Sequence, residues 1–164
     1  MCSYLVLSFL TSRSERDARE KPAVQLSPNM TARPSQPRPL KFRQLPGLYA
    51  IVRQPPKAPV PTWATTAAFT SISRTAEELS IVCPSDNIPK EFSAAPCWIC
   101  LKLEGPFPFS QTGILLSFIA PLSNNAIPIF AISTYDTDYV LVPQEHADRA
   151  LDLLSEAGHE LITG

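Results

Sequence analysis

The stretch WICLKLEGPFPFSQTGILLSFIAPL, residues 98–122, decides the fold because it joins two hydrophobic periodicities. Residues 98–104 alternate between hydrophobic and other positions, which predicts a strand with one face more buried. The hydrophobic positions on that face are Ile99, Leu101 and Leu103. After the break at Gly-Pro-Phe-Pro (105–108), helical spacing is followed by Ile114, Leu115, Phe118, Ile119 and Leu122. Ser110 is the expected helix N-cap, and Pro121 should kink the helix or end its regular part.

The residues after this helix predict two more strands, a second helix and a short last strand. The predicted strands are 128–134, 139–142 and 159–162, with a polar turn at 135–137. An amphipathic helix is marked by Ala147, Ala150, Leu151 and Leu154. The resulting order, strand, helix, strand, strand, helix, strand, is the ferredoxin-like βαββαβ arrangement of the α+β class. Its helices cover one sheet face, so the other face needs a second domain or a second chain.

The part of the chain before this unit predicts a leader and a smaller folded half. Ten of the 18 prolines lie between Pro22 and Pro61, and the first part mixes Ser, Arg and Pro without periodicity. This composition predicts a disordered leader over residues 1–38. Residues 39–94 have a similar but shrunken order of short strands and turns. We therefore expect a degenerate copy at 39–94, packed beside the complete unit at 95–164.

Composition excludes several classes of function. With 45% hydrophobic and 18% charged residues, the chain suits a globular core, and its net charge of −1 gives no general attraction to nucleic acid. The hydrophobic runs are far shorter than a membrane span. Residues 4–10 are apolar, but no Lys or Arg precedes them and no small-residue cleavage site follows. The expected location is therefore cytoplasmic.

The residues that usually support catalysis or metal binding do not cluster in this sequence. Cys97 and Cys100 have CxxC spacing, but residues three apart on a strand point to opposite faces, and no second Cys or His cluster supplies further ligands. The two histidines, His146 and His159, have no nucleophile near them in the sequence, and only five glycines are present. We predict no metal, no cofactor and no enzymatic activity, although a pair of catalytic carboxylates at Asp136 and Asp138 stays open as an alternative.

Two segments together resemble a known family. Phe-Ser-Gln-Thr-Gly-Ile at 109–114, followed by Ile-Ser-Thr-Tyr-Asp-Thr-Asp-Tyr at 132–139, is similar to the ACT-domain family. The similarity is to the branch of small bacterial and fungal ACT proteins, which includes the cytosolic arginine sensors of animal growth signalling. Residues 47–52 and 77–84 also resemble that branch, so the resemblance extends from about Leu45 to Leu161. It implies an ACT domain with a degenerate ACT-like half beside it, in a non-enzymatic regulatory protein.

The resemblance also implies a ligand and a place for it. ACT units of this branch bind a free amino acid at the interface between two units, where a loop faces a turn. On this chain those segments are Ser110, Gln111, Thr112, Gly113, Ser133, Thr134, Tyr135, Asp136, Thr137 and Asp138. The arginine sensors resemble four ACT-like units in one chain and this chain holds about two, which implies a homodimer or pairing with another ACT-containing protein. Gln111 stands where those sensors have an acidic residue, which argues against arginine as the ligand.

The chemistry of these residues fits an amino acid. A helix N-terminus near Ser110 would offer free backbone N–H groups to a carboxylate, and Asp138, more than Asp136, would accept hydrogen bonds from an ammonium. Simpler interpretations remain: Ser110 only caps a helix, the two aspartates only shape a tight turn, and Gly113 only permits close packing. A further alternative is a protein-interaction or oligomerisation module with a vestigial pocket.

Overall fold

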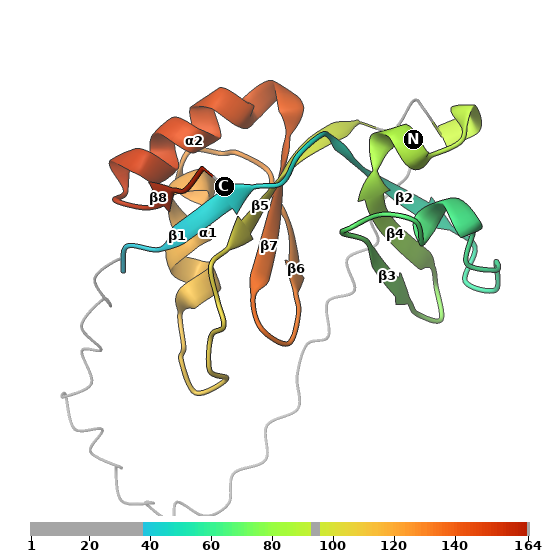
Figure 1. Ribbon diagram of the computed structural model, residues 1–164, viewed down its shortest axis with the longest axis horizontal. Coiled ribbons are helices and arrows are strands. Elements are labelled where there is room, and N and C mark those ends of the chain that lie inside the picture. Colours follow the sequence, from blue (N-terminus) through green and yellow to red (C-terminus); the bar gives the residue numbers. More distant parts are fainter. Residues whose placement is uncertain (1–37, 93–95, 164) are drawn as a thin grey trace, which may run out of the picture. The chain divides into compact units, whose positions relative to one another are not determined.

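The computed structural model describes residues 38–92 and 96–163 (Figure 1). The leader predicted for residues 1–38 lies outside the described residues, except for Arg38. The boundary predicted at residues 94 and 95 falls within the gap. The division into the halves 39–94 and 95–164 therefore stays a prediction.

The described residues form one eight-stranded sheet and two α-helices. The strands are β1 (Lys41–Gln44), β2 (Tyr49–Gln54), β3 (Ser71–Arg74), β4 (Leu79–Pro84), β5 (Cys97–Leu103), β6 (Phe130–Ser133), β7 (Asp138–Pro143) and β8 (Glu160–Leu161). The α-helices are α1 (Ile114–Asn124) and α2 (Ala147–Glu156). Short 3₁₀ turns occupy Thr62–Ala64, Ser85–Asn87, Lys90–Phe92 and Gln144–His146. Within the described ranges, neither helix has the length and apolar character needed to cross a membrane.

The C-terminal half has the predicted ferredoxin-like order, β5, α1, β6, β7, α2 and β8, so the α+β fold class is confirmed. β7 lies between β5 and β6 and is antiparallel to both, which explains why its residues are apolar on both faces. Pro121 lies within α1, which continues to Asn124, so the proline does not end the helix.

The N-terminal half repeats the same strand pairing with shorter connections. β2 pairs with β4 as β5 pairs with β7, and β3 pairs with β4 as β6 pairs with β7. The register also repeats, because Tyr49 lies opposite Pro84 and Trp98 lies opposite Pro143. The 3₁₀ turn at Thr62–Ala64 stands where the C-terminal half has α1. The expected degenerate copy is therefore present as a strand arrangement that lacks α-helices among its described residues.

Strand β5 is shared by the two halves. β7 runs along one edge of β5, and β1 and β2 follow each other along the opposite edge. Between β1 and β2 the chain bulges, with Gly47 at φ +77°, while the Leu45 N–H donates to the Cys100 carbonyl at 2.8 Å. β1 also pairs with β8, so a strand from the start of the described chain lies between β5 and β8 in the C-terminal sheet (Figure 1).

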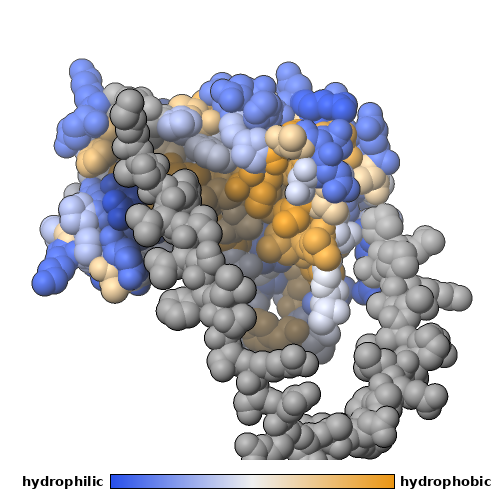
Figure 2. Space-filling view, turned by 180° about the vertical axis from the view of Figure 1, so that it is seen from behind, coloured by the Kyte–Doolittle hydropathy of each residue, from blue (hydrophilic) through white to orange (hydrophobic). Residues whose placement is uncertain are grey.

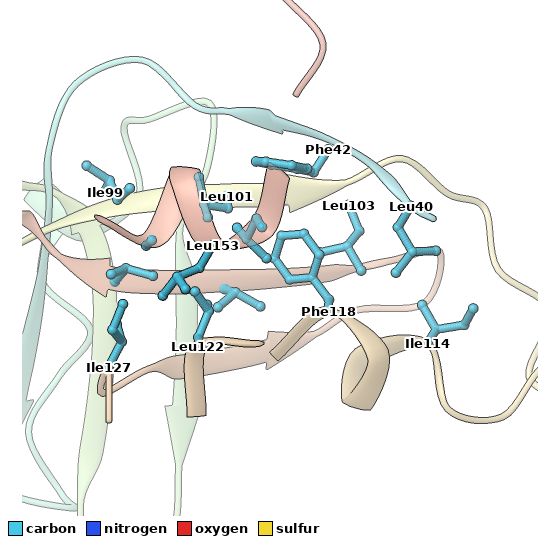
Figure 3. Close-up of a cluster of buried hydrophobic side chains, with 14 residues drawn as sticks. Leu40, Phe42, Ile99, Leu101, Leu103, Ile114, Phe118, Leu122, Ile127 and Leu153 are labelled. Carbon is cyan, nitrogen blue, oxygen red and sulfur yellow. The ribbon is translucent and has the colours of Figure 1, made fainter. Parts of the chain in front are cut away.

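The main core lies between this sheet and the two helices. Side chains from β1, β5, α1 and α2 converge there (Figure 3). The Phe42 and Phe118 rings, both buried, meet edge to face with centroids 5.1 Å apart. Because burial of one phenylalanine contributes about 1.5–3 kcal/mol, Phe42 ties the first strand firmly to the C-terminal half.

A second hydrophobic cluster covers the opposite sheet face and contains residues of both halves. Tyr49, Val82, Cys100 and Leu141 are its buried members. Phe69 of the N-terminal half stacks on Tyr139 of β7, with ring centroids 4.1 Å apart. In the space-filling view from behind, hydrophobic residues gather toward the middle and hydrophilic residues toward the outer edges (Figure 2). The N-terminal half thus supplies cover for the face that the sequence predicted to need a second domain or chain.

His159 connects three elements near the C-terminus. It is buried, its Nδ1 accepts the Leu40 N–H at 3.2 Å, and its Nε2 lies 3.2 Å from the Ser117 carbonyl. With the proton on Nε2, both ring nitrogens are paired. Burial lowers the pKa of His159, and the bond to the Ser117 carbonyl opposes that shift. The histidine therefore acts in the structure as a neutral connector of β1 and α1.

Candidate functional site

The loop between β5 and α1 and the turn between β6 and β7 lie against each other. The Phe107 N–H donates to the Asp136 carbonyl at 2.9 Å, and the buried Thr137 hydroxyl donates to the Leu103 carbonyl at 2.8 Å. At Gly105 a side chain is excluded, because a Cβ there would lie 2.5 Å from the Asp136 carbonyl oxygen. These contacts fix the two predicted binding segments as neighbours.

A cavity of about 200 Å³ opens between this loop and this turn. Its lining residues are Phe107, Pro108, Phe109, Gln111, Ile114 and the run Ser133–Asp138. Seven of the predicted residues, Gln111 and the six of the turn, therefore come together. Ser110, Thr112 and Gly113 do not line the cavity and are exposed on the loop.

The turn holds its two carboxylates differently. It is closed by the Thr137 carbonyl, which accepts from both the N–H and the hydroxyl of Thr134 at 2.8 Å. Asp138 accepts a hydrogen bond from the Ser133 hydroxyl, which lies directly opposite it in the sheet register. Asp136 is exposed and has no side-chain hydrogen bond within the described part of the chain. One carboxylate is thus oriented by the fold, and the other is open to solvent.

The helix start differs from the sequence prediction. Ser110 does not cap α1, because residues 108–111 form their own turn, in which the Gln111 N–H donates to the Pro108 carbonyl at 2.9 Å. The cap position is Gly113, at φ +81° and without a side-chain hydrogen bond. A Cβ at Gly113 would meet no atom within 4 Å, so glycine is favoured there by its positive φ rather than by close packing. The expectation that Ser110 caps the helix is therefore wrong.

Two aromatic rings stand at the rim of the cavity. Phe109 and Tyr135 are 78% and 79% exposed, and their rings meet edge to face with centroids 5.2 Å apart. Large aromatic side chains are seldom so exposed unless they contact something. Phe107 and Ile114 lie deeper and also line the cavity, although their sequence pattern indicates only hydrophobic core. In the sequence, only their position beside the predicted loop could have identified these two residues as part of the cavity lining.

The lining of the cavity is rich in hydrogen-bond acceptors. Its charged lining residues are Asp136 and Asp138, and none of the lining residues is a Cys, His, Lys or Arg. No group of three or more metal-ligating side chains occurs within residues 38–92 and 96–163. What the lining offers is carboxylate and hydroxyl acceptors, the Gln111 amide and an apolar floor.

The CxxC pair lies away from this cavity and has a structural environment. Cys83, Cys97 and Cys100 are free thiols, and Cys83 and Cys100 are buried. Burial raises the pKa of the Cys100 thiol to about 12, so the thiol stays protonated near neutral pH. A protonated, buried thiol is neither a nucleophile nor a good metal ligand.

Comparisons with known proteins agree with the fold. A family model of the ACT domain matches residues 93–156, and a second family model, described only as an N-terminal domain, matches residues 47–91. An X-ray structure of a structural-genomics target from Agobacterium tumefaciens is 44% identical, with a TM-score of 0.69, and the match covers 76% of this chain and 93% of that one. No curated protein sequence matches this chain significantly.

A more distant structure shares the fold alone. It is a Vibrio cholerae protein of unknown function, described as a possible transport protein. It is 18% identical, with a TM-score of 0.57, and the match covers 69% of this chain and 85% of that one.

Proposed function

Because residues 93–156 match a family model of the ACT domain, we propose that the chain is a non-enzymatic regulatory protein that binds a free amino acid between the β5–α1 loop and the β6–β7 turn. ACT domains are regulatory rather than catalytic, and they commonly bind small ligands such as amino acids. The observation on which the proposal rests is the cavity of about 200 Å³ that both segments line. We place the chain in the branch of small ACT proteins related to the arginine sensors.

The ligand groups have matching partners in this cavity. Asp138, held in place by Ser133, accepts from the ligand ammonium, and Asp136 gives a second acceptor. The first turn of α1 begins at Ile114, on the cavity wall, and its unpaired N–H groups face a carboxylate favourably. Gln111 supplies an amide that can donate and accept. An amino acid bound in this way pairs both charges, which burial otherwise makes costly.

We further propose that a second ACT unit covers the cavity, from a homodimer or from another ACT-containing protein. Phe109 and Tyr135 project from the rim and are largely exposed, so a partner surface placed there would bury both rings. The three free thiols among the described residues support a reducing, cytoplasmic location.

An alternative function follows from the same ring pair. If the cavity is vestigial, Phe109 and Tyr135 would serve only as a contact surface for another protein, and the chain would be an interaction or oligomerisation module. Ligand-dependent stabilisation separates the two functions, because only an amino acid that binds the native state raises its melting temperature.

The test is a thermal-shift screen of the whole chain against the twenty amino acids at millimolar concentration. We expect one of them to raise the melting temperature by about 5 °C or more when its concentration is well above its Kd. Asp138→Asn should abolish the shift, and Asp136→Asn should reduce it. Asp148→Asn, which changes an exposed carboxylate on α2, is the matched control and should leave the shift unchanged.

Two results would contradict amino-acid binding at this cavity. One is a hit that neither Asp136→Asn nor Asp138→Asn affects, because the ligand would then bind elsewhere. The other is no hit from a folded, dimeric protein, which would favour the interaction module. Dimerisation lost with Phe109→Ser, measured by sedimentation, would then identify the ring pair as its contact.

A further inference from the structure

A second, larger cavity lies between the two halves, on the sheet face opposite the helices. It has a volume of about 320 Å³ and is bordered by β3 and β4 on one side and by β6 on the other. β3 and β6 each pair with only one other strand among the described residues, so each presents an open edge. All four residues of β6 line the cavity, as expected where a strand edge forms part of the wall.

The repeat explains why the cavity exists. The register of β3 on β4 corresponds to that of β6 on β7, since Ser73 lies opposite Ser80 as Ile132 lies opposite Tyr139. At three matched positions the N-terminal half has a serine where the C-terminal half has a large apolar residue. The pairs are Ser71 and Phe130, Ser73 and Ile132, and Ser80 and Tyr139. Phe130, Ile132 and Tyr139 all pack in the second hydrophobic cluster, so the serines leave volume unfilled on that face.

The serine wall offers hydrogen-bonding groups. Ser71, Ser73 and Ser80 have no side-chain hydrogen bond to any residue in the described ranges. Ser73 is exposed, and Ser71 and Ser80 are half-buried, so all three hydroxyls are open to solvent or to a ligand. The three hydroxyls therefore form a ready set of donors and acceptors on one wall.

Charge on this wall is already balanced. Glu78 lines the cavity, and its Oε2 accepts the Arg53 Nε–H at 2.8 Å. Its Oε1 has no hydrogen-bond partner within the described residues, so the carboxylate can still accept from a ligand hydroxyl. No other lining residue is charged. A cationic ligand would compete with Arg53, and a ligand carboxylate would find no cation in the wall.

The opposite wall is apolar. Phe130 and Ile132 of β6 line it, and Val82 forms part of the floor. A ligand that fills the cavity thus meets hydroxyls on one side and hydrocarbon on the other, and a volume near 300 Å³ is at the lower limit of ordinary small-molecule sites.

We propose that this cavity binds a small neutral polyhydroxylated molecule of monosaccharide size. Such a molecule presents hydroxyls that donate to Glu78 and exchange hydrogen bonds with Ser73 and Ser80, while its C–H face rests on Phe130 and Ile132. A zwitterionic amino acid is a poorer match, because its carboxylate lacks a partner here. The site meets the cavity between the β5–α1 loop and the β6–β7 turn at Ser133, which lines both, and its occupancy does not require that an amino acid binds there.

The test is a ¹H–¹⁵N NMR titration of the whole chain with D-glucose, D-ribose and myo-inositol, each to tens of millimolar. We expect saturable shifts for at least one of these probes, centred on β3, β4 and β6. The double variant Ser73→Ile with Ser80→Tyr introduces the residues that the C-terminal half has at the matched positions. Their larger side chains fill the cavity, so the affinity for the bound probe should fall at least tenfold. Ser123→Ile, an exposed change on α1, is the control and should bind as the wild type does.

A second variant tests the proposal even if the double variant does not fold. Glu78→Gln keeps the size of the side chain and removes the charge that accepts from the ligand, so it should weaken binding several-fold while the spectrum stays native. The amino-acid response of the loop–turn cavity should persist in all these variants. No saturable shift with any of the three probes, or full affinity in both the Glu78→Gln and the double variant, would overturn the proposal.

Discussion

The two halves of the molecule share a strand arrangement but differ in how the loop after the first strand meets the later turn. In the C-terminal half the contact is made by the main chain, through Phe107 and Asp136, and a cavity remains beside it. In the N-terminal half the Arg74 guanidinium spans the gap and donates to the carbonyls of Pro56 and Ala58. The comparison shows that one half has a cavity-lining loop followed by an α-helix, while the other has mainly the sheet.

The same difference appears in the cores. The C-terminal core lies between the sheet and two α-helices of 11 and 10 residues. The N-terminal core, made by Ala64, Leu79, Ile81 and Cys83, is covered by 3₁₀ turns and the loops beside them. We therefore expect most of the stability to come from the C-terminal half, and the following experiments test that expectation.

The largest effect should come from Phe118→Ala in the C-terminal core. Phe118 is fully buried on α1 and contacts the rings of Phe42 and His159. Removing a buried phenylalanine typically lowers the free energy of unfolding by about 3–5 kcal/mol. Urea denaturation measures the change, with Leu116→Ala on the same helix as the control, because Leu116 is 64% exposed and should change stability by less than about 0.5 kcal/mol. A loss below 1 kcal/mol for Phe118→Ala would mean that α1 contributes little to the fold.

A somewhat smaller effect is expected from Ile81→Ala in the N-terminal core. Ile81 is fully buried on β4, and its truncation should lower the free energy of unfolding by about 2–4 kcal/mol. Because β2 pairs with β5, the loss should reach both halves together. Trp63 reports on the N-terminal half and Trp98 on β5, so fluorescence of the Trp63→Phe and Trp98→Phe variants follows each region separately. Different urea midpoints for the two signals would show that the halves unfold as independent domains.

The smallest effect is a pH dependence from His159. Its pKa in the folded protein is below the ordinary value of about 6.5, so the unfolded chain binds the proton more readily. The contribution of His159 to the free energy of unfolding is therefore fully present above about pH 6.5 and is lost as the pH falls below that value. The urea midpoint should be lower at pH 5.5 than at pH 7.5, and His159→Gln should remove most of this difference. His146→Gln is the control, and a difference that survives His159→Gln would assign the pH dependence to other groups.

Much of the fold could be predicted because the strands and helices have strong hydrophobic periods. The alternation around Leu101 and the helical spacing around Phe118 set the order of elements in the C-terminal half. The polar residues 135–137 predict the turn between two apolar strands, whereas the full set from Ser133 to Asp138 follows from the resemblance to the ACT family. The position of β1 between β5 and β8 could not be predicted from the sequence, because pairing between distant segments leaves no local pattern.

The start of α1 shows why the site was only partly predictable. Ser110 has the side chain of an N-cap, but two prolines precede it, and Pro108 begins a turn that places Ser110 outside the helix. Gly113 takes the cap position through its backbone conformation, which the residue type permits but does not specify. The serines of β3 and β4 that line the second cavity could not be singled out, because an isolated serine in a strand pattern predicts little until the matched residue of the other half is known.

The position of β1 limits how such a chain can exchange parts in evolution. A crossover after Gln44 would transfer the C-terminal half without the strand that covers the β5 edge and without the Phe42 ring. The recipient would inherit an open sheet edge and a hole in its core. The C-terminal half therefore depends on a strand that precedes the N-terminal half, and we expect the two halves to be exchanged together.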